Sequence, residues 1–518
     1  MEPVTDLLFA MRIKGAKIWS NEGLLLYDAP RGALSPSDIE ILRARKQEIV
    51  ALLNRSPPSW LLRTPPLGRR LPSERVPLTP LQWSFFRKAI AAGGVSKREA
   101  VLVSRLRGPL DISALRQALR DLIRRHEILN TRIVVRDGVP LQETAPVGAL
   151  RLEPIEMPGG SLGEREKSAR SIVGQLVAAP TDMAKDPLFV AELLVLDERD
   201  HVLLIAMDPI AFDPGSIPLL QRDLCVLYAR AAHGKPAPLP PVSLQFADYA
   251  VWQQKALGPW ADERVGYWVA QLSGARRLTV FSEDGPTTPR LGLSSFRFDQ
   301  ALTAALRRFS LQHRTTLLMS LLTAYVVTLS QWCGTPDLTL QVPPIARRFR
   351  ELQHTVGPLG TVLYLRVRLR PEDRFLDLLL RVVADFNAAY EHDDGGKVVA
   401  DLPRPPFASN PRFNFISQEL IASIQPDLGW SYATGPDGSE ITVERFEVDL
   451  PDDGQIEEPF LRVVDRRDHL VGLLSYRAQR VMPGTIHRFE QSFRFFVQTM
   501  MDEPTSRLPR LPQTTIKE

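Results

Sequence analysis

The feature that most constrains the fold is a strand, loop and helix pattern in the middle of the chain. The six apolar residues 202–207 precede the polar loop 208–216, and an amphipathic stretch follows over 217–230. A short apolar run bounded by turn residues is typical of a buried strand, and apolar spacing of three or four is typical of a helix. Residues 100–106 and 113–126 repeat this order. Such alternation predicts an α/β fold.

Length and charge limit the function classes. At 518 residues, a prior of roughly 150 residues per domain predicts two to four folding units. Hydrophobic residues make up 44% of the chain and charged residues 24%, which is typical of a protein with a sizeable core. The 64 basic and 60 acidic residues give a net charge of +4. So balanced a charge gives no support for a nucleic-acid partner, and we expect none.

The cysteines and the apolar runs bear on the compartment. Cys225 and Cys333 each lie in an apolar helical pattern without a second ligand at metal-binding spacing, so we expect core residues and no metal site. A count of two fits a reducing compartment. No apolar run approaches the ~20 residues that span a bilayer, and Asp6 and Arg12 interrupt the place of a signal peptide. We predict a cytoplasmic protein without a membrane partner.

Residues 1–55 have the pattern of a small separate unit. Helical spacing over 4–11 is followed by two β-type runs, 17–20 and 24–27, which flank the turn residues 21–23. This arrangement predicts a β-hairpin with a three-residue turn.

A second helix is expected after the hairpin. Ser35 followed by Pro36 predicts a helix start, with the serine as cap and the proline at the first helical position. Apolar spacing continues to Asn54, and the Pro- and Arg-rich segment 56–75 is typical of a stiff linker. The predicted order is helix, hairpin, helix and linker.

Several motifs along the chain resemble those of the condensation family of nonribosomal peptide synthetases. The loop Asp208-Pro209-Ile210-Ala211-Phe212-Asp213-Pro214 stands where that family usually has His-His-x-x-x-Asp-Gly. Four further motifs resemble the family in the expected order: Val76-Pro77-Leu78-Thr79-Pro80-Leu81-Gln82, Arg125-His126-Glu127-Ile128-Leu129-Asn130-Thr131-Arg132, Gln245 to Gln254 followed by Tyr267-Trp268, and Pro344-Ile345-Ala346-Arg347-Arg348. Two others have drifted, Val356-Gly357-Pro358-Leu359-Gly360-Thr361 and Glu391-His392-Asp393-Asp394.

The resemblance implies a fold and a set of partners. It implies two pseudo-symmetric chloramphenicol-acetyltransferase-like lobes that form a V-shaped tunnel, over 76–272 and 273–505, with a tail or linker over 506–518. Such domains hold no cofactor of their own, because their substrates arrive on the phosphopantetheine arms of upstream and downstream carrier proteins.

The first 55 residues resemble the N-terminal β-hairpin docking domain of some synthetase subunits. There the hairpin edge receives the C-terminal tail of an upstream subunit by strand addition. The resemblance therefore assigns docking to five residues of the two expected strands: Lys17, Ile18, Trp19, Leu24 and Leu26.

The loop differs from the family's motif at the two histidine positions, where the motif's chemistry lies. Asp208 and Pro209 replace both histidines, and proline offers no side-chain donor or acceptor. Asp208 is the nearest substitute as a base, although a carboxylate ends a strand equally well by binding a loop amide. Asp213 keeps the family's aspartate, whose expected partner is Arg348.

Two further residues complete the candidate site. Ser216 is expected either to cap the helix that follows or to complete the D-x-x-x-x-D-x-x-S pattern of the heterocyclization branch. His392 lies in a segment that the family places near the tunnel. The candidate catalytic residues are thus Asp208 and Asp213, supported by Arg348, Ser216 and His392.

Three functions stay open at this point. The first is condensation between carrier-bound thioesters to form an amide or ester. The second is heterocyclization to a thiazoline or oxazoline, which the loop favours but the other motifs do not: Gln82 to Lys88 lacks that branch's tyrosine and Gly-Arg end. The third is an inactive homologue that binds carriers or recruits a tailoring enzyme.

Overall fold

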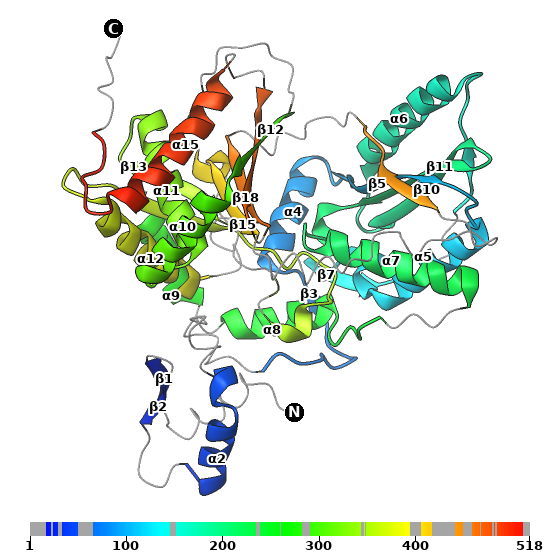
Figure 1. The fold of residues 1–518 in the computed structure, drawn as a ribbon. Coiled ribbons are helices and arrows are strands. Elements are labelled where there is room, and N and C mark those ends of the chain that lie inside the picture. The colour runs from blue at the N-terminus through cyan, green and yellow to red at the C-terminus, as the bar shows by residue number, and fades with distance from the viewer. Residues whose placement is uncertain are drawn as a thin grey trace.

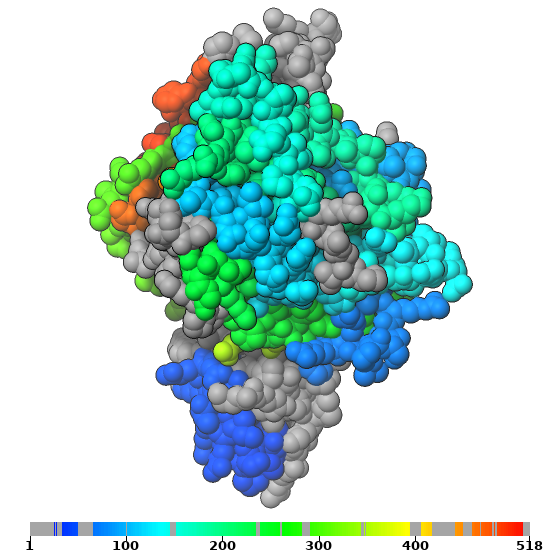
Figure 2. Space-filling view, turned by 90° about the vertical axis from the view of Figure 1, so that its right-hand side faces the viewer, coloured from blue at the N-terminus to red at the C-terminus, as the bar shows by residue number. Residues whose placement is uncertain are grey.

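The computed structural model describes most of the chain. The described residues are 17–21, 24–28, 34–49, 66–145, 152–234, 239–258, 261–281, 291–342, 347, 349–393, 406–416, 441–448, 458–466, 468–478, 481 and 484–510. The N-terminal unit protrudes from a larger body (Figures 1 and 2), and Figure 1 shows that this body consists of two lobes.

The N-terminal unit contains the predicted hairpin. β1 (Lys17–Asn21) pairs antiparallel with β2 (Leu24–Asp28), and Asn21 lies opposite Leu24. The hairpin is confirmed, but the predicted three-residue turn is wrong, because Asn21 belongs to the strand ladder.

The helix after the hairpin begins as expected. α2 (Pro36–Ala44) starts at Pro36, and the Ser35 hydroxyl accepts a hydrogen bond from the Asp38 amide in a capping box. The helix ends at Ala44, well before Asn54, and helical backbone resumes over 46–49. The helix expected over 4–11 lies outside the described residues.

The first lobe is built on a five-stranded sheet in the order β16-β5-β11-β10-β8. Its strands are β5 (Glu99–Arg107), β8 (Ile155–Glu156), β10 (Phe189–Asp197), β11 (Asp200–Met207) and β16 (Thr442–Arg445), and its helices are α5 (Ile112–Arg125), α6 (Leu162–Ala178) and α7 (Ser216–His233). Around them lie β3 (Val76–Pro77), α4 (Pro80–Ala91), β4 (Ser96–Lys97), β6 (Thr131–Arg136), β7 (Val139–Thr144), β9 (Pro180–Thr181) and α8 (Phe246–Leu257).

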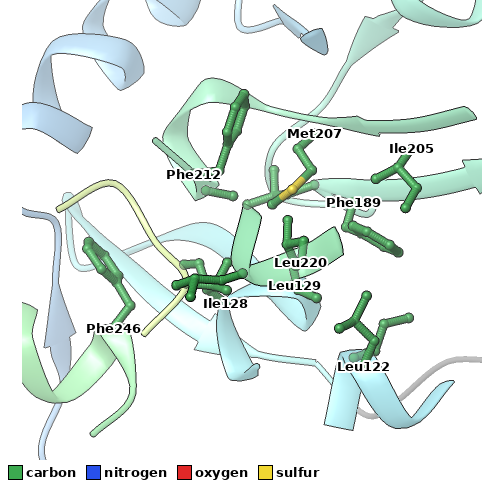
Figure 3. Packing of buried hydrophobic residues seen from close by; sticks show 14 of the residues in the cluster. Leu122, Ile128, Leu129, Phe189, Ile205, Met207, Phe212, Leu220 and Phe246 are labelled. Atoms are coloured by element: carbon green, nitrogen blue, oxygen red, sulfur yellow. The ribbon is translucent and has the colours of Figure 1, made fainter. Parts of the chain in front are cut away.

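Strand β11 is apolar over 202–207 because both of its faces are buried. Successive side chains of a strand point to opposite faces. Val202 and Leu204 join a core cluster with residues of α6, whereas Leu203, Ile205 and Met207 join the cluster that contains residues of α5 and α7. Figure 3 shows Ile205 and Met207 beside Phe189 in this second cluster.

The second lobe is built on a six-stranded sheet in the order β12-β18-β17-β15-β13-β14. Its strands are β12 (Leu291–Phe298), β13 (Asp337–Val342), β14 (Leu363–Arg368), β15 (Arg412–Ile416), β17 (Phe460–Asp465) and β18 (Leu470–Arg477). Its helices are α9 (Ala261–Leu272), α10 (Gln300–Gln312), α11 (Leu317–Cys333), α12 (Phe375–Glu391) and α15 (Thr485–Asp502). Helices α10, α11, α12 and α15 cover one face, and the other face is turned toward the first lobe (Figure 1).

Two segments of the C-terminal half are built into the first lobe. β16 pairs antiparallel with β5 at the edge of the five-stranded sheet. Phe349, Leu352, Val356 and Leu359 are buried in the core cluster of the first lobe. The lobes are therefore linked by strand pairing and by hydrophobic packing. The boundary between the lobes that is expected near residue 273 stays a prediction.

Part of the expected linker is fixed to the body. The Arg70 guanidinium forms ion pairs with Glu127 (Nη2 to Oε1, 2.5 Å) and Asp248 (Nη1 to Oδ1, 2.9 Å). The chain is thus anchored before it enters β3. Cys225 is buried and Cys333 partly buried, as expected for core residues.

The described residues bear on membrane and metal binding in two respects. Over the described parts of the chain, no helix alone has the length and apolarity to cross a bilayer; the bent pair α10 and α11 meets that test only when joined, across a 104° break. Among the residues that the structure describes, no group of three His, Cys, Asp or Glu side chains is placed to hold a metal ion.

Candidate functional site

The loop after β11 begins with a tight turn at Asp208. The Asp208 amide donates to the Leu188 carbonyl at 2.8 Å, which continues the sheet for one residue. The carboxylate Oδ1 then accepts from the Ile210 amide at 3.0 Å and caps the short 3₁₀ helix Pro209–Ala211. This is the structural role expected of an aspartate at a strand end.

Asp208 is buried completely. Its exposed fraction is 0%, and its second oxygen, Oδ2, accepts from the Ser96 hydroxyl of β4. Burial raises the pKa of Asp208, against the hydrogen bonds from Ser96 and Ile210 and the charge of Arg98. A raised pKa suits a general base, but both carboxylate oxygens have partners and no part of the side chain reaches the surface.

The loop is also held by the glutamine of the motif at the start of α4. Gln82 is fully buried, and its Nε2 donates to the Ile210 carbonyl at 3.0 Å and to Gln142 Oε1 at 3.1 Å. Thr79 caps α4 with Gln82 in a reciprocal capping box. The position of Gln82 is therefore fixed by the helix start, and the loop backbone is fixed by Gln82.

Asp213 joins the loop to the C-terminal half of the chain. Its Oδ1 accepts from Arg347 Nη2 at 2.9 Å, and its Oδ2 accepts from Arg347 Nη1 at 3.2 Å and from the Gly360 amide at 3.0 Å. An arginine partner was expected, but at Arg348, which lies outside the described residues. Among the described residues, the neighbouring Arg347 makes this contact, and the role expected of Arg348 stays a prediction.

Ser216 does not cap the helix that follows. α7 begins at Ser216 itself, and the preceding position belongs to Gly215. The Ser216 hydroxyl instead donates to Asp213 Oδ1 at 2.7 Å and accepts from the Gly357 amide at 3.1 Å. The expectation that Ser216 caps the helix is therefore wrong. Its hydroxyl forms hydrogen bonds with the nearby Asp213 carboxylate and the distant Gly357 amide, so it does not cap the amides of the helix.

Two glycines leave room for the contacts among Asp213, Ser216 and Arg347, which form a clasp between the loop and the C-terminal half of the chain. A Cβ at Gly215 would lie 2.1 Å from Arg347 Nη1, and one at Gly357 would lie 2.4 Å from the Phe246 ring. Gly357 also has a φ of 152°, which disfavours other residues. Gly360 contributes its amide to Asp213. The drifted motif 356–361 therefore keeps a defined structural role, which its sequence did not predict.

His392 lies outside this cluster of contacts. It follows α12, and its ring stacks on Tyr267 of α9 with centroids 4.0 Å apart. Its Nδ1 is 2.8 Å from the Ala388 carbonyl, and its own carbonyl accepts from Trp268 Nε1 at 2.7 Å. These contacts join the end of α12 to α9 and include no residue of loop 208–216. The expected role of His392 in supporting the site stays a prediction.

A buried ionic cluster joins α5 to α7. Asp223 is fully buried and forms contacts with Arg125 Nε (2.6 Å), His126 Nε2 (2.9 Å) and Arg222 Nη2 (2.6 Å). Burial opposes the charge of Asp223, but these three partners outweigh it and hold its pKa at about 2. Burial lowers the pKa of His126. A histidine and two arginines therefore surround a buried carboxylate, which gives the motif 125–132 a structural role.

The docking residues lie on the confirmed hairpin. Lys17, Ile18 and Trp19 belong to β1, and Leu24 and Leu26 belong to β2. Their side chains are outside what the structure describes, so their role in docking stays a prediction.

Comparison with known families agrees with this geometry. The condensation domain model matches residues 73–406, and the TubC N-terminal docking domain model matches residues 4–55. A linear gramicidin synthase of Brevibacillus parabrevis is 28% identical over 464 residues, which cover 86% of this chain and 9% of that protein. Phosphinothricin tripeptide synthetase PhsC of Streptomyces viridochromogenes is 28% identical, covering 80% of this chain and 38% of that protein. The chain thus spans well under half the length of these relatives.

Solved structures share the fold. The X-domain in complex with OxyB from teicoplanin biosynthesis has a TM-score of 0.69 and 23% identity, covering 87% of this chain and 99% of that one. The EpoB cyclization-docking bidomain of Sorangium cellulosum has a TM-score of 0.62 and 18% identity, covering 97% and 99%. Because the condensation model matches well over half of its residues, this chain belongs to the condensation domain family of nonribosomal peptide synthetases, and a TubC-type docking domain precedes that domain.

Proposed function

We propose that the chain catalyses condensation-type acyl transfer between two carrier-bound groups, and that the loop 208–216 acts as a scaffold, not as a base. One observation carries this proposal. The loop keeps its clasp through Asp213, Ser216 and Arg347, whereas both oxygens of Asp208 are used inside the protein. The part of the loop that sets the shape is therefore retained, and the part that would move a proton is missing.

The reaction needs few protein groups. An amine or hydroxyl on the acceptor attacks the thioester carbonyl of the donor, so that a C–N or C–O bond forms and the C–S bond breaks. The nucleophile's proton leaves, and the donor arm becomes a thiol. Holding the two reactants in line contributes about 7–11 kcal/mol in favourable intramolecular cases. General base catalysis adds about 10²–10⁴-fold, so we expect a slow enzyme.

The proposal includes partners and location. The substrates would arrive on phosphopantetheine arms of upstream and downstream carrier proteins, and the protein itself would supply no cofactor. The C-terminal tail of an upstream subunit would add to the hairpin of β1 and β2, because a two-stranded sheet leaves backbone groups at its edges for a further strand. Such an assembly line would lie in the cytoplasm.

A second candidate is a carrier-binding or recruitment module without catalytic activity. It is favoured by the same burial of Asp208 and by Pro209, which has no group that could take up a proton. Heterocyclization has less support. Its three pattern residues do not converge, since Asp208 contacts Ser96 and Ile210 while Asp213 and Ser216 contact Arg347.

Intact-protein mass spectrometry separates the three functions. Donor-loaded and acceptor-loaded carrier proteins are mixed with the chain, and the acceptor's mass is followed over time. A mass gain equal to the donor group supports condensation, and a further loss of water supports heterocyclization. No gain, with carriers that bind the chain in a pull-down, contradicts the catalytic proposal and leaves recruitment.

A further inference from the structure

A guanidinium without a counter-ion among the described residues lies in the middle of the second sheet. Arg462 is on β17, between β15 and β18, with Asn414 and Leu473 opposite it in register. The neighbouring Leu461 and Val463 belong to the core that the helices cover. Because strand side chains alternate, Arg462 points to the other face, which Figure 1 shows turned toward the first lobe.

The contacts of Arg462 are few for so large a polar group. Its Nη2 donates to the Ser475 hydroxyl at 2.9 Å, and the guanidinium lies 4.7 Å from the centre of the Phe460 ring. The side chain is partly buried, and its Nε atom is buried without a hydrogen-bond partner among the residues that the structure describes. Partial burial lowers the pKa of Arg462, and no neighbouring charge opposes this effect in the part of the chain that the structure describes.

Two other arginines withdrawn from solvent in the sheets of this chain are neutralised. Arg366 on β14 of the same sheet binds Asp337 with two hydrogen bonds of 2.8 and 2.6 Å. Arg105 in the first sheet binds Asp200 and Glu166. A cation that is withdrawn from water without such a partner is costly. An anion from outside the chain would remove that cost at Arg462.

We propose that Arg462 binds an anionic group of the substrate, a carboxylate or a phosphate, on the sheet face between the lobes. The planar guanidinium offers several N–H donors to such a group, and Ser475 and Asn414 add neutral polar groups around it. The carboxylate would belong to the transferred acyl group or the acceptor, and the phosphate to a carrier arm. This inference rests on the proposed function, because it assumes that substrates enter between the lobes.

Direct binding tests this site without requiring catalysis. The probes are the N-acetylcysteamine thioesters of aspartate and asparagine, which differ in one carboxylate, and phosphopantetheine with pantetheine, which differ in one phosphate. Calorimetry gives Kd for each probe with the full chain, with Arg462→Gln and with Arg308→Gln. Arg308 is exposed on α10, on the far side of the sheet, so its variant controls for the loss of one positive charge.

The wild-type chain should prefer the charged member of one pair by about tenfold, as expected for a charge-assisted contact. Arg462→Gln should reduce that preference below about twofold, and Arg308→Gln should keep it. The pair that responds identifies the carboxylate or the phosphate. Equal affinities within both pairs, no binding of any probe, or an unchanged preference in Arg462→Gln would overturn the inference.

A fold control and a transfer control complete the design. Arg462→Gln keeps a donor for Ser475 and removes a partly buried charge, so its melting temperature should not fall below that of the wild type. Transfer between carriers that bear neutral groups tests the proposed function separately. If the wild type transfers nothing, the proposed function fails, and the binding experiment still decides the role of Arg462.

Discussion

The clasp between Asp213 and Arg347 should be a large single contribution to the stability of the loop. The exposed fractions of these side chains are 5% and 10%, and Asp213 also accepts from Ser216 and Gly360. Removing one partner of a buried ion pair leaves the other charge uncompensated and costs about 3–5 kcal/mol. We therefore expect Asp213→Ala to lower the free energy of unfolding by about that amount.

Equilibrium unfolding in urea, followed by circular dichroism, measures this loss. The double variant Asp213→Ala/Arg347→Met removes both charges and should recover part of it, with a coupling energy of about 1–3 kcal/mol. The matched control is Glu143→Ala, which breaks an exposed pair with Arg136 and should cost at most about 1 kcal/mol. A loss in Asp213→Ala no larger than in the control, or no recovery in the double variant, would refute the reasoning.

Three other predictions follow from the same structure. Asp208→Ala leaves the Ile210 amide without its partner and removes one of the two hydrogen bonds of the Ser96 hydroxyl, which also donates to the Thr181 carbonyl at 3.3 Å. This change should cost about 1–3 kcal/mol in urea unfolding, whereas Asp208→Asn can keep both hydrogen bonds and should cost less. Gly357→Ala places a Cβ 2.4 Å from Phe246 at a positive φ, so its melting temperature should fall clearly below the wild type's. Burial lowers the pKa of His126, so between this lowered pKa and about pH 6.5 the unfolded chain binds the proton more readily than the folded chain. Stability should therefore fall from about pH 7 to about pH 5, and His126→Gln should reduce that fall; unchanged pH profiles would contradict this.

Local patterns in the sequence predicted the elements but not their long-range contacts. The hairpin, the Ser35 cap and the strand before Asp208 each depend on neighbouring residues, and the structure has them. The carboxylate of Asp213 was assigned an arginine, but the choice between Arg347 and Arg348 depends on how a distant segment packs. The amide of Gly360 could not be anticipated, because nearly every residue has one.

Resemblance to the family had a similar limit. It predicted the two lobes and the docking hairpin, because those follow from motifs kept in order. It did not predict where β16 pairs, nor that Arg462 would lie in the sheet without a counter-ion among the described residues. Both depend on the relation between strands that are far apart in the chain, which no local pattern encodes.

The most direct test of the scaffold role is the rate of acyl transfer between loaded carriers with Asp208→Asn. The asparagine can keep the hydrogen bonds to Ser96 and Ile210 but has no carboxylate to take up a proton. Intact-protein mass spectrometry should give a rate within a few-fold of the wild type's, with circular dichroism confirming the fold. Loss of transfer in a folded Asp208→Asn variant would show that the carboxylate acts as the base and would contradict the account.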